Sequence, residues 1–178
     1  SAGLSSNAHH SGVIFCKFAF AKKQLYLETI DYRNPRLLLD ASKVEEGSIT
    51  WRSPSNLAII KYWGKHGNQL PRNPSISLTL DAAYTETTVY YTPQKEKWEK
   101  GIRLKFFFED QPNEAFEKKI RQYLESMTDI FPFLRQLELV IRSRNSFPHS
   151  SGIASSASSM SALALCLCAL EHRFFGTL

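Results

Sequence analysis

Two stretches of this 178-residue chain carry side chains that could bind an anion, and residues 61–65 form the first. Lys61 and Lys65 stand four positions apart, with a tyrosine, a tryptophan and a glycine between them. Two ammonium groups can surround one phosphate, and a phenol adds a directed hydrogen bond. The residues also fit an amphipathic passage from a strand into a loop, with aromatic side chains anchoring the core. Taken alone, the residues leave both interpretations open.

The second stretch, residues 145–171, begins with small polar residues and then has no charged side chain from Ile153 until Glu171. A glycine- and serine-rich loop before a helix leaves backbone N–H groups unpaired at the positive end of the helix dipole. Phosphate binds readily at such an end. Ser155, Ser156, Ser158 and Ser159 could add hydroxyl groups to phosphate oxygens or to a metal that phosphate holds. The alternative is a buried helix with a serine-rich cap.

The second stretch also resembles the phosphate loop of the GHMP kinase superfamily. The family motif is Pro-x-x-x-Gly-[Leu/Ile]-[Gly/Ala]-Ser-Ser-Ala, and this chain has it from Pro148 to Ala157. In that superfamily the loop cradles the triphosphate of ATP, which implies a magnesium ion as well. Ser156 is then expected to contact the ATP phosphates, to take part in catalysis and to ligate Mg²⁺. The resemblance implies that the nucleotide contacts are Ser151, Gly152, Ile153, Ala154, Ser155 and Ser156.

The first stretch resembles the N-terminal signature of the diphosphomevalonate decarboxylases, one branch of that superfamily. The signature is Asn56-Leu-Ala-x-x-Lys61-Tyr62-Trp63-Gly64-Lys65, and residues 70–80 resemble the segment that follows it. The resemblance implies that Lys61 lies near the reacting centre and that Asn56 orients the substrate. Lys119 is interpreted either as a basic residue for the substrate diphosphate or as an ordinary surface lysine. The substrate diphosphate would be bound by Tyr62, Trp63, Gly64 and Lys65.

The activity that this resemblance implies is ATP-dependent decarboxylation of 5-diphosphomevalonate to isopentenyl diphosphate, a step of isoprenoid biosynthesis. The family further implies a cytoplasmic enzyme that forms a homodimer at full length. Two alternatives remain. A related small-molecule kinase would stop after phosphorylation, and a non-catalytic half-domain would bind phosphate without turnover. His149, beside Pro148, has no carboxylate partner in sequence and is interpreted as a loop residue near the ligand.

Strands and one amphipathic helix are expected between the two motifs. Alternation of β-branched and aromatic residues predicts strands, whereas apolar residues on one face of 113–127 predict a helix. The uncharged run 153–170 is at the margin for a membrane span, but its serines and alanines favour a buried helix. The pattern indicates an α+β domain, and the family implies a ribosomal-protein-S5-like lobe. The expected strands are 48–52, ended by Ser53-Pro54, then 84–92, 103–109 and 137–144.

Composition excludes several classes of protein. A hydrophobic fraction of 43% suits a packed core, and a net charge of +5 without a dense Lys/Arg run does not favour nucleic-acid binding. Three cysteines without zinc spacing suggest reduced thiols in a cytosol. The apolar stretch 13–27 is too short for a membrane span and is interrupted by Lys17, Lys22 and Lys23, and no charge precedes Lys17 as a signal peptide would require. It could be an extra strand or hairpin, a targeting segment or sequence upstream of the native start. Residues 1–46 are interpreted as a peripheral extension, and 47–178 as the N-terminal ATP- and substrate-binding lobe.

We predict that the 178-residue chain alone binds its ligands weakly and turns over little or nothing. The family places a catalytic aspartate and a substrate-gripping Gly-Ser-Gly-Ser-x-x-Arg segment in a second half that this sequence does not contain. The measurement is release of CO₂ from 5-diphosphomevalonate by the isolated chain with Mg-ATP. Decarboxylation above background would contradict the prediction.

Overall fold

The computed structural model describes residues 31–40, 42–61, 63–67, 70–94, 101–148 and 152–176. By its internal contacts the chain divides into two compact units, Ser1–Asp31 and Tyr32–Leu178. All of the described residues except Asp31 belong to the second unit.

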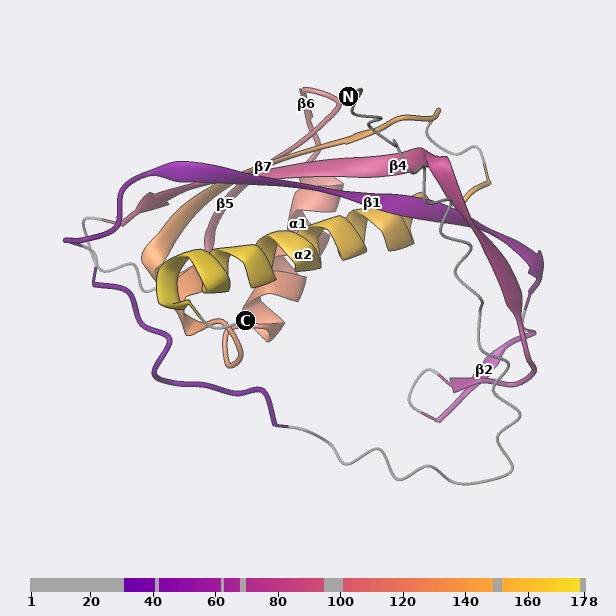
Figure 1. Cartoon of the computed structure of the whole chain (residues 1–178), viewed down its shortest axis with the longest axis horizontal. Helices are drawn as coiled ribbons and strands as arrows, with labels where there is room; N and C mark the ends of the chain where they lie inside the picture. The colour runs from indigo at the N-terminus through magenta and orange to yellow at the C-terminus, as the bar shows by residue number, and fades with distance from the viewer. Residues whose placement is uncertain are drawn as a thin grey trace, which may run out of the picture. The chain divides into compact units, whose positions relative to one another are not determined.

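A five-stranded mixed sheet forms the framework of this unit (Figure 1). Its strand order is β1-β4-β7-β5-β6, and its strands pair antiparallel except for β5 with β7. The parallel pair is possible because helix α1 lies between its two strands in the chain and carries the connection back. The strands are β1 (Gly47–Ile60), β4 (Ile76–Pro93), β5 (Arg103–Phe108), β6 (Gln111–Pro112) and β7 (Leu137–Asn145).

Helices α1 (Glu114–Ser126) and α2 (Ser155–Phe175) cover the same face of this sheet (Figure 1). The side chains that point toward them alternate along each strand with exposed ones, as the period of two in a strand requires. A short 3-10 turn, Pro132–Gln136, adds Phe133 and Leu134 to the same core. The central buried side chains are Val89, Leu104, Phe106, Leu124, Phe133, Leu139, Ile141, Leu163, Leu167 and Leu170.

The predicted helix over 113–127 is confirmed as α1. Asn113 is its N-cap, and the side-chain oxygen of Asn113 accepts a hydrogen bond from the Phe116 N–H at 3.0 Å. Ile120 and Leu124 are buried four residues apart, which places them on one face of the helix. The α+β class and the strands predicted over 84–92, 103–109 and 137–144 are confirmed in the same way.

The prediction that the first strand ends at Ser53-Pro54 is wrong, because β1 continues to Ile60. The proline is tolerated because β1 is an edge strand, where a missing N–H on the open side leaves no neighbour unpaired. The pairing with β4 shifts register between Pro54 and Ser55, so the strand bends there without ending. Strand β4 likewise extends back to Ile76, beyond the start that its composition suggested.

Strand β7 pairs with β4 only from Thr85 onward. The part of β4 that precedes Thr85 in the chain therefore pairs with β1 alone. Residues 55–60 and 76–80 therefore form a two-stranded arm, which bends away from the sheet in Figure 1. The segment that joins them carries a small separate ribbon, β2 (Lys65–His66) with β3 (Leu70–Pro71).

Residues 34–44 contribute to the core of the unit. Leu37 is 5% exposed and belongs to the hydrophobic cluster. The carboxamide of Gln136 accepts from the Leu39 N–H at 2.7 Å and donates to the Leu39 carbonyl at 3.0 Å. The last part of the expected extension thus packs on the lobe, whereas a boundary near residue 46 stays a prediction.

The face of the sheet that turns away from the helices is polar. Glu86 lies there between Arg52 and Arg144, at 2.5 and 2.6 Å. Hydrogen bonds from Arg52, and then from Arg144, hold the pKa of the Glu86 carboxyl below its usual range, although its burial opposes the shift.

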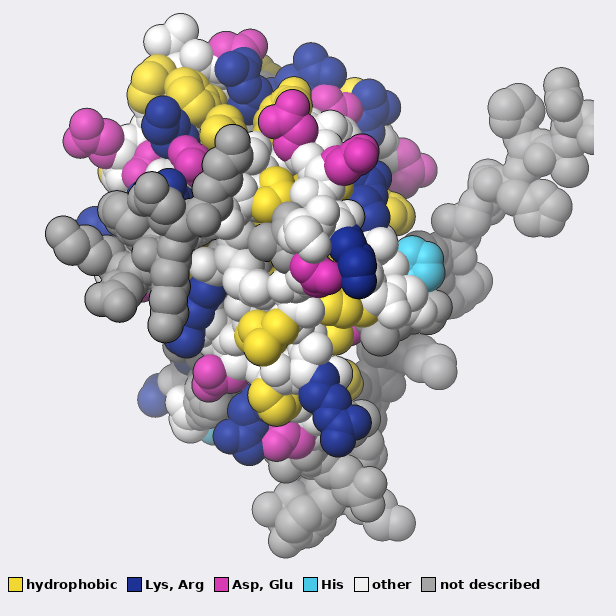
Figure 2. All heavy atoms as spheres, turned by 90° about the vertical axis from the view of Figure 1, so that its left-hand side faces the viewer, with side chains coloured by type: hydrophobic (Ala, Val, Ile, Leu, Met, Phe, Trp, Pro, Cys, Tyr) yellow, Lys and Arg dark blue, Asp and Glu magenta, His cyan; other side chains and the backbone are white. Residues whose placement is uncertain are grey.

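Figure 2 shows the end of the unit at the left of Figure 1, where cationic and anionic side chains are interspersed.

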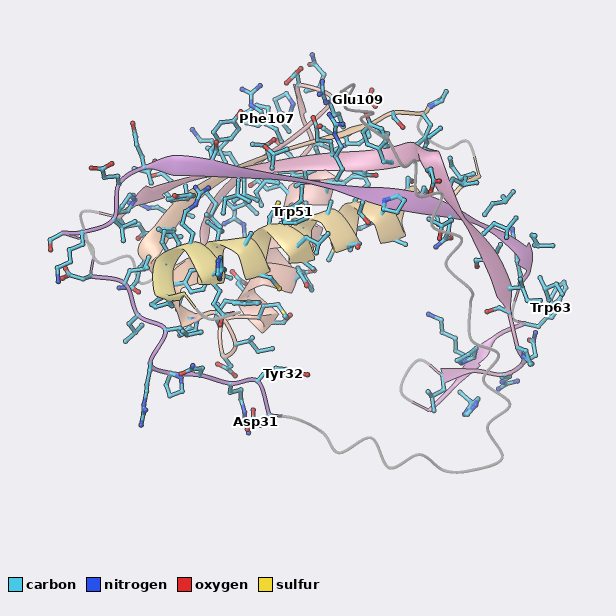
Figure 3. The ribbon with its side chains drawn as sticks, viewed as in Figure 1. Asp31, Tyr32, Trp51, Trp63, Phe107 and Glu109 are labelled. Carbon is cyan, nitrogen blue, oxygen red and sulfur yellow. The ribbon has the colours of Figure 1, made fainter. Side chains whose placement is uncertain are left out.

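Glu109 and Asp110 form a two-residue turn between β5 and β6, at the top of Figure 3, and both have positive φ (48° and 62°). This is the conformation of a type I′ hairpin, which favours Asn-Gly. We therefore predict that Glu109→Asn raises the free energy of unfolding by up to about 1 kcal/mol, because asparagine adopts the left-handed conformation at a lower energetic cost than glutamate.

Urea unfolding of the Glu109→Asn variant measures this effect. Glu109→Val is the control, since a β-branched side chain suits positive φ least and should lower the unfolding midpoint. A lower midpoint for Glu109→Asn as well would contradict the assignment of the turn.

Candidate phosphate-binding site

Strand β7 delivers the chain into the serine-rich loop, and helix α2 starts at Ser155. The N-cap residue is Ala154, which has no side chain that could accept from the first N–H groups. A 21-residue helix places a partial positive charge at this end. The N–H groups of Ala154, Ser155 and Ala157 already donate to the carbonyls of Asn56, Ile153 and Ala154, at 3.2, 2.6 and 3.2 Å. Among the described residues, the Ser156 N–H is the donor of the first turn that remains for a ligand, and a serine or an aspartate at position 154 would satisfy it internally.

The four serines at the start of α2 divide into two groups. Ser158 is 2% exposed, and its hydroxyl lies 2.7 Å from that of Thr85, while the Ser159 hydroxyl donates to the Ser155 carbonyl at 2.8 Å. By sequence each of the four serines could offer a hydroxyl to a ligand, but the Ser158 hydroxyl bonds inward. Ser155 is half-buried, and Ser156 is exposed at the loop, as a ligand contact requires.

The loop residues Gly152 and Ile153 are the remaining nucleotide candidates that the structure describes. Gly152 has φ of +81°, and nothing lies within 4 Å of the point that a Cβ atom would occupy. A glycine is therefore favoured there by the backbone conformation and not by crowding. Tyr62, Ser151 and His149, which the sequence singled out, lie outside the described residues.

One backbone hydrogen bond brings the two sequence motifs together. The Ala154 N–H, at the start of α2, donates to the Asn56 carbonyl of β1 at 3.2 Å. These residues are almost a hundred positions apart in the chain, and each belongs to a different predicted motif. The predicted phosphate loop therefore ends beside β1, the strand that leads to Lys61.

Lys61, Trp63, Gly64 and Lys65 lie in the segment that joins the two strands of the arm, and all four are exposed. Trp63 is 84% exposed, and Figure 3 shows it at the end of the arm away from the helices. Gly64 has φ of +79°, a left-handed conformation that reverses the chain between Trp63 and Lys65.

Asn73 holds this segment, a role that sequence reasoning did not assign. Its side-chain oxygen accepts from the Trp63 N–H at 2.5 Å, and its amide donates to the carbonyls of Lys61 and Pro74 at 3.3 and 2.8 Å. The Arg72 N–H also donates to the Gly64 carbonyl at 3.2 Å. An Asn-Pro pair is a common turn signal, which is the feature of the sequence that could have indicated it.

A cavity of about 270 Å³ lies between the two helices and the sheet, next to the start of α2. Its walls include Ser156 and Ser159 on one side and a stack of aromatic rings on the other. The Phe116 ring lies 6.1 Å from that of Phe106 and 6.2 Å from that of Phe108. Lys119 lines the same cavity, with its ammonium 5.6 Å from the centre of the Phe116 ring. Lys119 thus shares a cavity with Ser156 and Ser159 of α2, whereas Lys61 and Lys65 lie in the segment that joins the strands of the arm.

Asn145, the last residue of β7, is a second candidate that sequence reasoning passed over. Its Nδ2 atom is buried and has no hydrogen-bond partner among the described residues. With Phe108, Phe116, Ser155, Ser156 and Ser159 it lines a small hollow at the foot of α2. A buried amide nitrogen without a partner is uncommon in folded proteins, and this hollow, of about 10 Å³, has room for a single acceptor atom.

No cluster of three or more metal-binding side chains occurs in the part of the chain that the structure describes. Burial raises the pKa of the Cys166 thiol to about 12, so this cysteine is inert at neutral pH. Neither described helix has the length and hydrophobicity that a membrane span needs. The chemistry of the site thus consists of backbone N–H groups, hydroxyls, one amide and lysines.

The fold is that of a lobe of the GHMP kinases. Its mixed sheet leads, through a glycine- and serine-rich loop, into a helix whose N-cap side chain makes no hydrogen bond. The chain belongs to the diphosphomevalonate decarboxylase family. The family model that matches residues 53–173 is described as the diphosphomevalonate decarboxylase-like N-terminal domain. Both resemblances that the motifs carry, to the superfamily and to this branch of it, are confirmed.

Curated relatives and solved structures agree with this assignment. The diphosphomevalonate decarboxylases of Candida albicans and Saccharomyces cerevisiae are 39% and 37% identical over 119 residues, which is 62% of this chain. The chain spans about a third of their length, 33% and 30%.

Among solved structures, the Staphylococcus aureus mevalonate diphosphate decarboxylase is 31% identical, with a TM-score of 0.57. That match covers 70% of this chain and 38% of that one. A structure of the Enterococcus faecalis enzyme, described in terms of an ATP-binding mechanism mediated by mevalonate diphosphate, is 33% identical with a TM-score of 0.52. It covers 72% of this chain and 43% of that one.

We predict that Ala154→Asp stabilises the fold and weakens anion binding. A carboxylate at the N-cap would accept from the first N–H groups of α2 and raise the free energy of unfolding by about 1 kcal/mol. It would occupy the same donors that a phosphate needs and would repel it, lowering affinity at least roughly tenfold. Thermal unfolding and titration with inorganic tripolyphosphate measure the two effects.

Ala154→Asn is the matched control, because it caps the helix without adding charge. It should give most of the stability gain and a smaller loss of affinity. If tripolyphosphate bound equally to the parent chain and to Ala154→Asp, the anion site would lie elsewhere.

Proposed function

We propose that these residues are the nucleotide- and substrate-binding lobe of an ATP-dependent decarboxylase acting on 5-diphosphomevalonate. The observation that carries the proposal is the hydrogen bond from the Ala154 N–H to the Asn56 carbonyl. It sets an uncapped helix N-terminus beside the strand that leads to two lysines and an exposed tryptophan. Two anionic groups, one at each motif, could therefore be held side by side.

The N-terminus of α2 is the proposed site of the ATP phosphates, with the nucleoside in the adjoining cavity. Gly152, Ile153, Ala154 and Ser155 would contribute the loop backbone, and Ser156 a hydroxyl. The aromatic stack of Phe106, Phe108 and Phe116 gives the cavity flat apolar walls that suit a purine.

The residues fit a magnesium ion only as companions of the nucleotide. Mg²⁺ keeps several waters and binds mainly through substrate phosphates, which agrees with the lack of a metal-binding cluster among the described residues. Ser156 is the side chain that we propose as its protein ligand. Bound there, the ion would neutralise charge on the phosphates.

The arm is the proposed site of the substrate diphosphate. Trp63, Gly64 and Lys65, together with Tyr62, would bind it, while Lys61 would lie near the reacting centre and Asn56 would orient the substrate. The left-handed Gly64 and the bonds from Asn73 fix the backbone of this segment before any ligand arrives. Lys119 lines the cavity next to the start of α2, and we therefore assign it to the nucleotide instead of to the substrate diphosphate.

The proposed reaction phosphorylates the tertiary hydroxyl of the substrate and then releases phosphate and CO₂ to give isopentenyl diphosphate. Catalysis of this kind depends on holding two anions in register and on stabilising charge as it develops. The lysines, the helix N-terminus and Ser156 would supply that positioning. We also propose a reducing, cytoplasmic compartment, which the free thiols of Cys166 and Cys168 support, and a homodimer at full length.

The test uses a family-length polypeptide that contains these residues, with Mg-ATP and 5-diphosphomevalonate. We expect phosphate and CO₂ in equal amounts, and a fall in kcat of about a hundredfold for Ser156→Ala, the size of effect that removal of one charge-stabilising donor has elsewhere. Ser161→Ala is the control, since that serine is exposed on the same helix and away from the loop.

Other outcomes would change the assignment. ADP with a phosphorylated product and no CO₂ would favour a kinase that stops at the first step. Neither product from a folded protein would leave a phosphate-binding domain without catalytic activity.

A further inference from the structure

Three polar side chains form a hydrogen-bonded chain beneath the first turns of α2, two of them buried and the third, Asn145, half-buried. Thr85 on β4 is 0% exposed and Ser158 on α2 is 2% exposed. The Thr85 hydroxyl donates to the Asn145 side-chain oxygen at 2.8 Å and lies 2.7 Å from the Ser158 hydroxyl. Hydroxyl groups in a core are costly unless they are fully bonded, so this arrangement requires an explanation.

The backbone fixes the position of all three groups. Thr85 and Asn145 are directly opposite each other in the antiparallel pairing of β4 with β7, so their side chains share one face. Ser158 meets them from the second turn of the helix above. Threonine is β-branched and has few side-chain rotamers, which makes its hydroxyl a rigid link between the strand pair and the helix.

The hydrogens of the network then determine which way the Asn145 amide faces. Thr85 has one hydroxyl hydrogen, and it goes to the Asn145 oxygen. The Ser158 hydroxyl must therefore donate to Thr85 in that arrangement. The Asn145 oxygen is thus turned inward, and its NH₂ group faces the hollow lined by Phe108, Phe116 and Ser156.

The reverse arrangement would have the opposite effect on a ligand. Ser158 could instead donate to the Ser155 carbonyl at 3.0 Å, and Thr85 to Ser158. Asn145 would then donate to Thr85 and present its oxygen to the hollow, where it would repel an electronegative atom. The Thr85 hydroxyl couples the orientation of the Asn145 amide to that of the Ser158 hydroxyl, because it bonds to both. Its donation to the Asn145 oxygen is the state that presents the NH₂ group to the hollow.

We propose that Thr85 and Ser158 are positioning residues that hold the Asn145 amide as a fixed donor to an acceptor atom of the bound nucleotide. The inference rests on the proposed nucleotide site and adds a donor that does not come from the helix N-terminus. The buried Nδ2, without a partner among the described residues, supplies two hydrogens within a hollow that Ser155 and Ser156 also line. A phosphate oxygen and a ring nitrogen of the base have the same acceptor chemistry.

The orientation of the amide can be measured without any ligand. In the ¹⁵N-labelled 178-residue chain, the Asn145 NH₂ protons should show nuclear Overhauser effects to the rings of Phe108 and Phe116. In Thr85→Val, which keeps the shape but loses the hydroxyl, these effects should weaken as the amide turns over, and Thr85→Ser should restore them. Effects from the NH₂ protons to Thr85 in the parent chain would overturn the proposal, even if every variant failed to fold.

Thr87→Val is the matched control for orientation. Thr87 lies two residues along the same strand, is 2% exposed, and pairs its hydroxyl with that of Ser143 at 3.0 Å. It loses the same kind of buried hydroxyl pair without touching Asn145. The amide should keep its orientation in this variant, and a change equal to that in Thr85→Val would overturn the specific role of Thr85.

Titration with Mg-ATP and with inorganic tripolyphosphate then tests the role in binding. We expect both the Asn145 NH₂ and the Ser155 and Ser156 amides to shift with Mg-ATP, and the dissociation constant to rise roughly fivefold in Thr85→Val. An Asn145 shift with tripolyphosphate as well assigns the contact to a phosphate, and a shift with Mg-ATP alone assigns it to the nucleoside.

The two proposals fail in different ways. Shifts at Ser155 and Ser156 without a shift at Asn145 would overturn this inference and leave the proposed nucleotide site intact. No shift at any of the three with either ligand would overturn both.

Discussion

The hydrogen bond from the Ala154 N–H to the Asn56 carbonyl is the constraint on which the two halves of the site depend. Backbone groups at a loop and an edge strand need partners, and here each satisfies the other. Because Asn56 lies just after the bend at Pro54 and Ser55, the bond holds the arm to the helix at the point where β1 leaves the sheet. The two candidate anion-binding segments are joined at this contact.

Local pattern accounts for most of what the sequence predicted correctly. Alternation of residue types predicted β4, β5 and β7, and the spacing of apolar residues predicted α1. When one face of an element is buried, its apolar residues recur with the period of that element, so the sequence shows the period. The path of β1 through Pro54 could not be predicted in this way. A proline ends an inner strand but not an edge strand, and which strand is at the edge is decided by the pairing of the whole sheet.

The same division applies to the candidate site. The phosphate loop was found because its glycine and serines are consecutive in the chain. The roles of Asn145, Thr85 and Ser158 arise from cross-strand register and from a helix that returns over the sheet. Ser158 in particular is of a residue type that often contacts phosphate, but its position in the fold is that of a core residue. The roles of Lys61, Ser156 and their neighbours in binding or catalysis remain predictions.

The two-stranded arm gives the lobe an uneven stiffness. Each inner strand of the sheet is hydrogen-bonded on both sides, whereas residues 55–60 and 76–80 pair with each other alone. Local opening requires fewer bonds to break in such a ribbon, so the arm belongs to the least protected part of the lobe. The bonds from Asn73 hold the segment at the end of the arm, but a ligand there would still bear the cost of steadying the ribbon that carries it. Affinity at the arm would depend on whatever polypeptide surface steadies it from the other side.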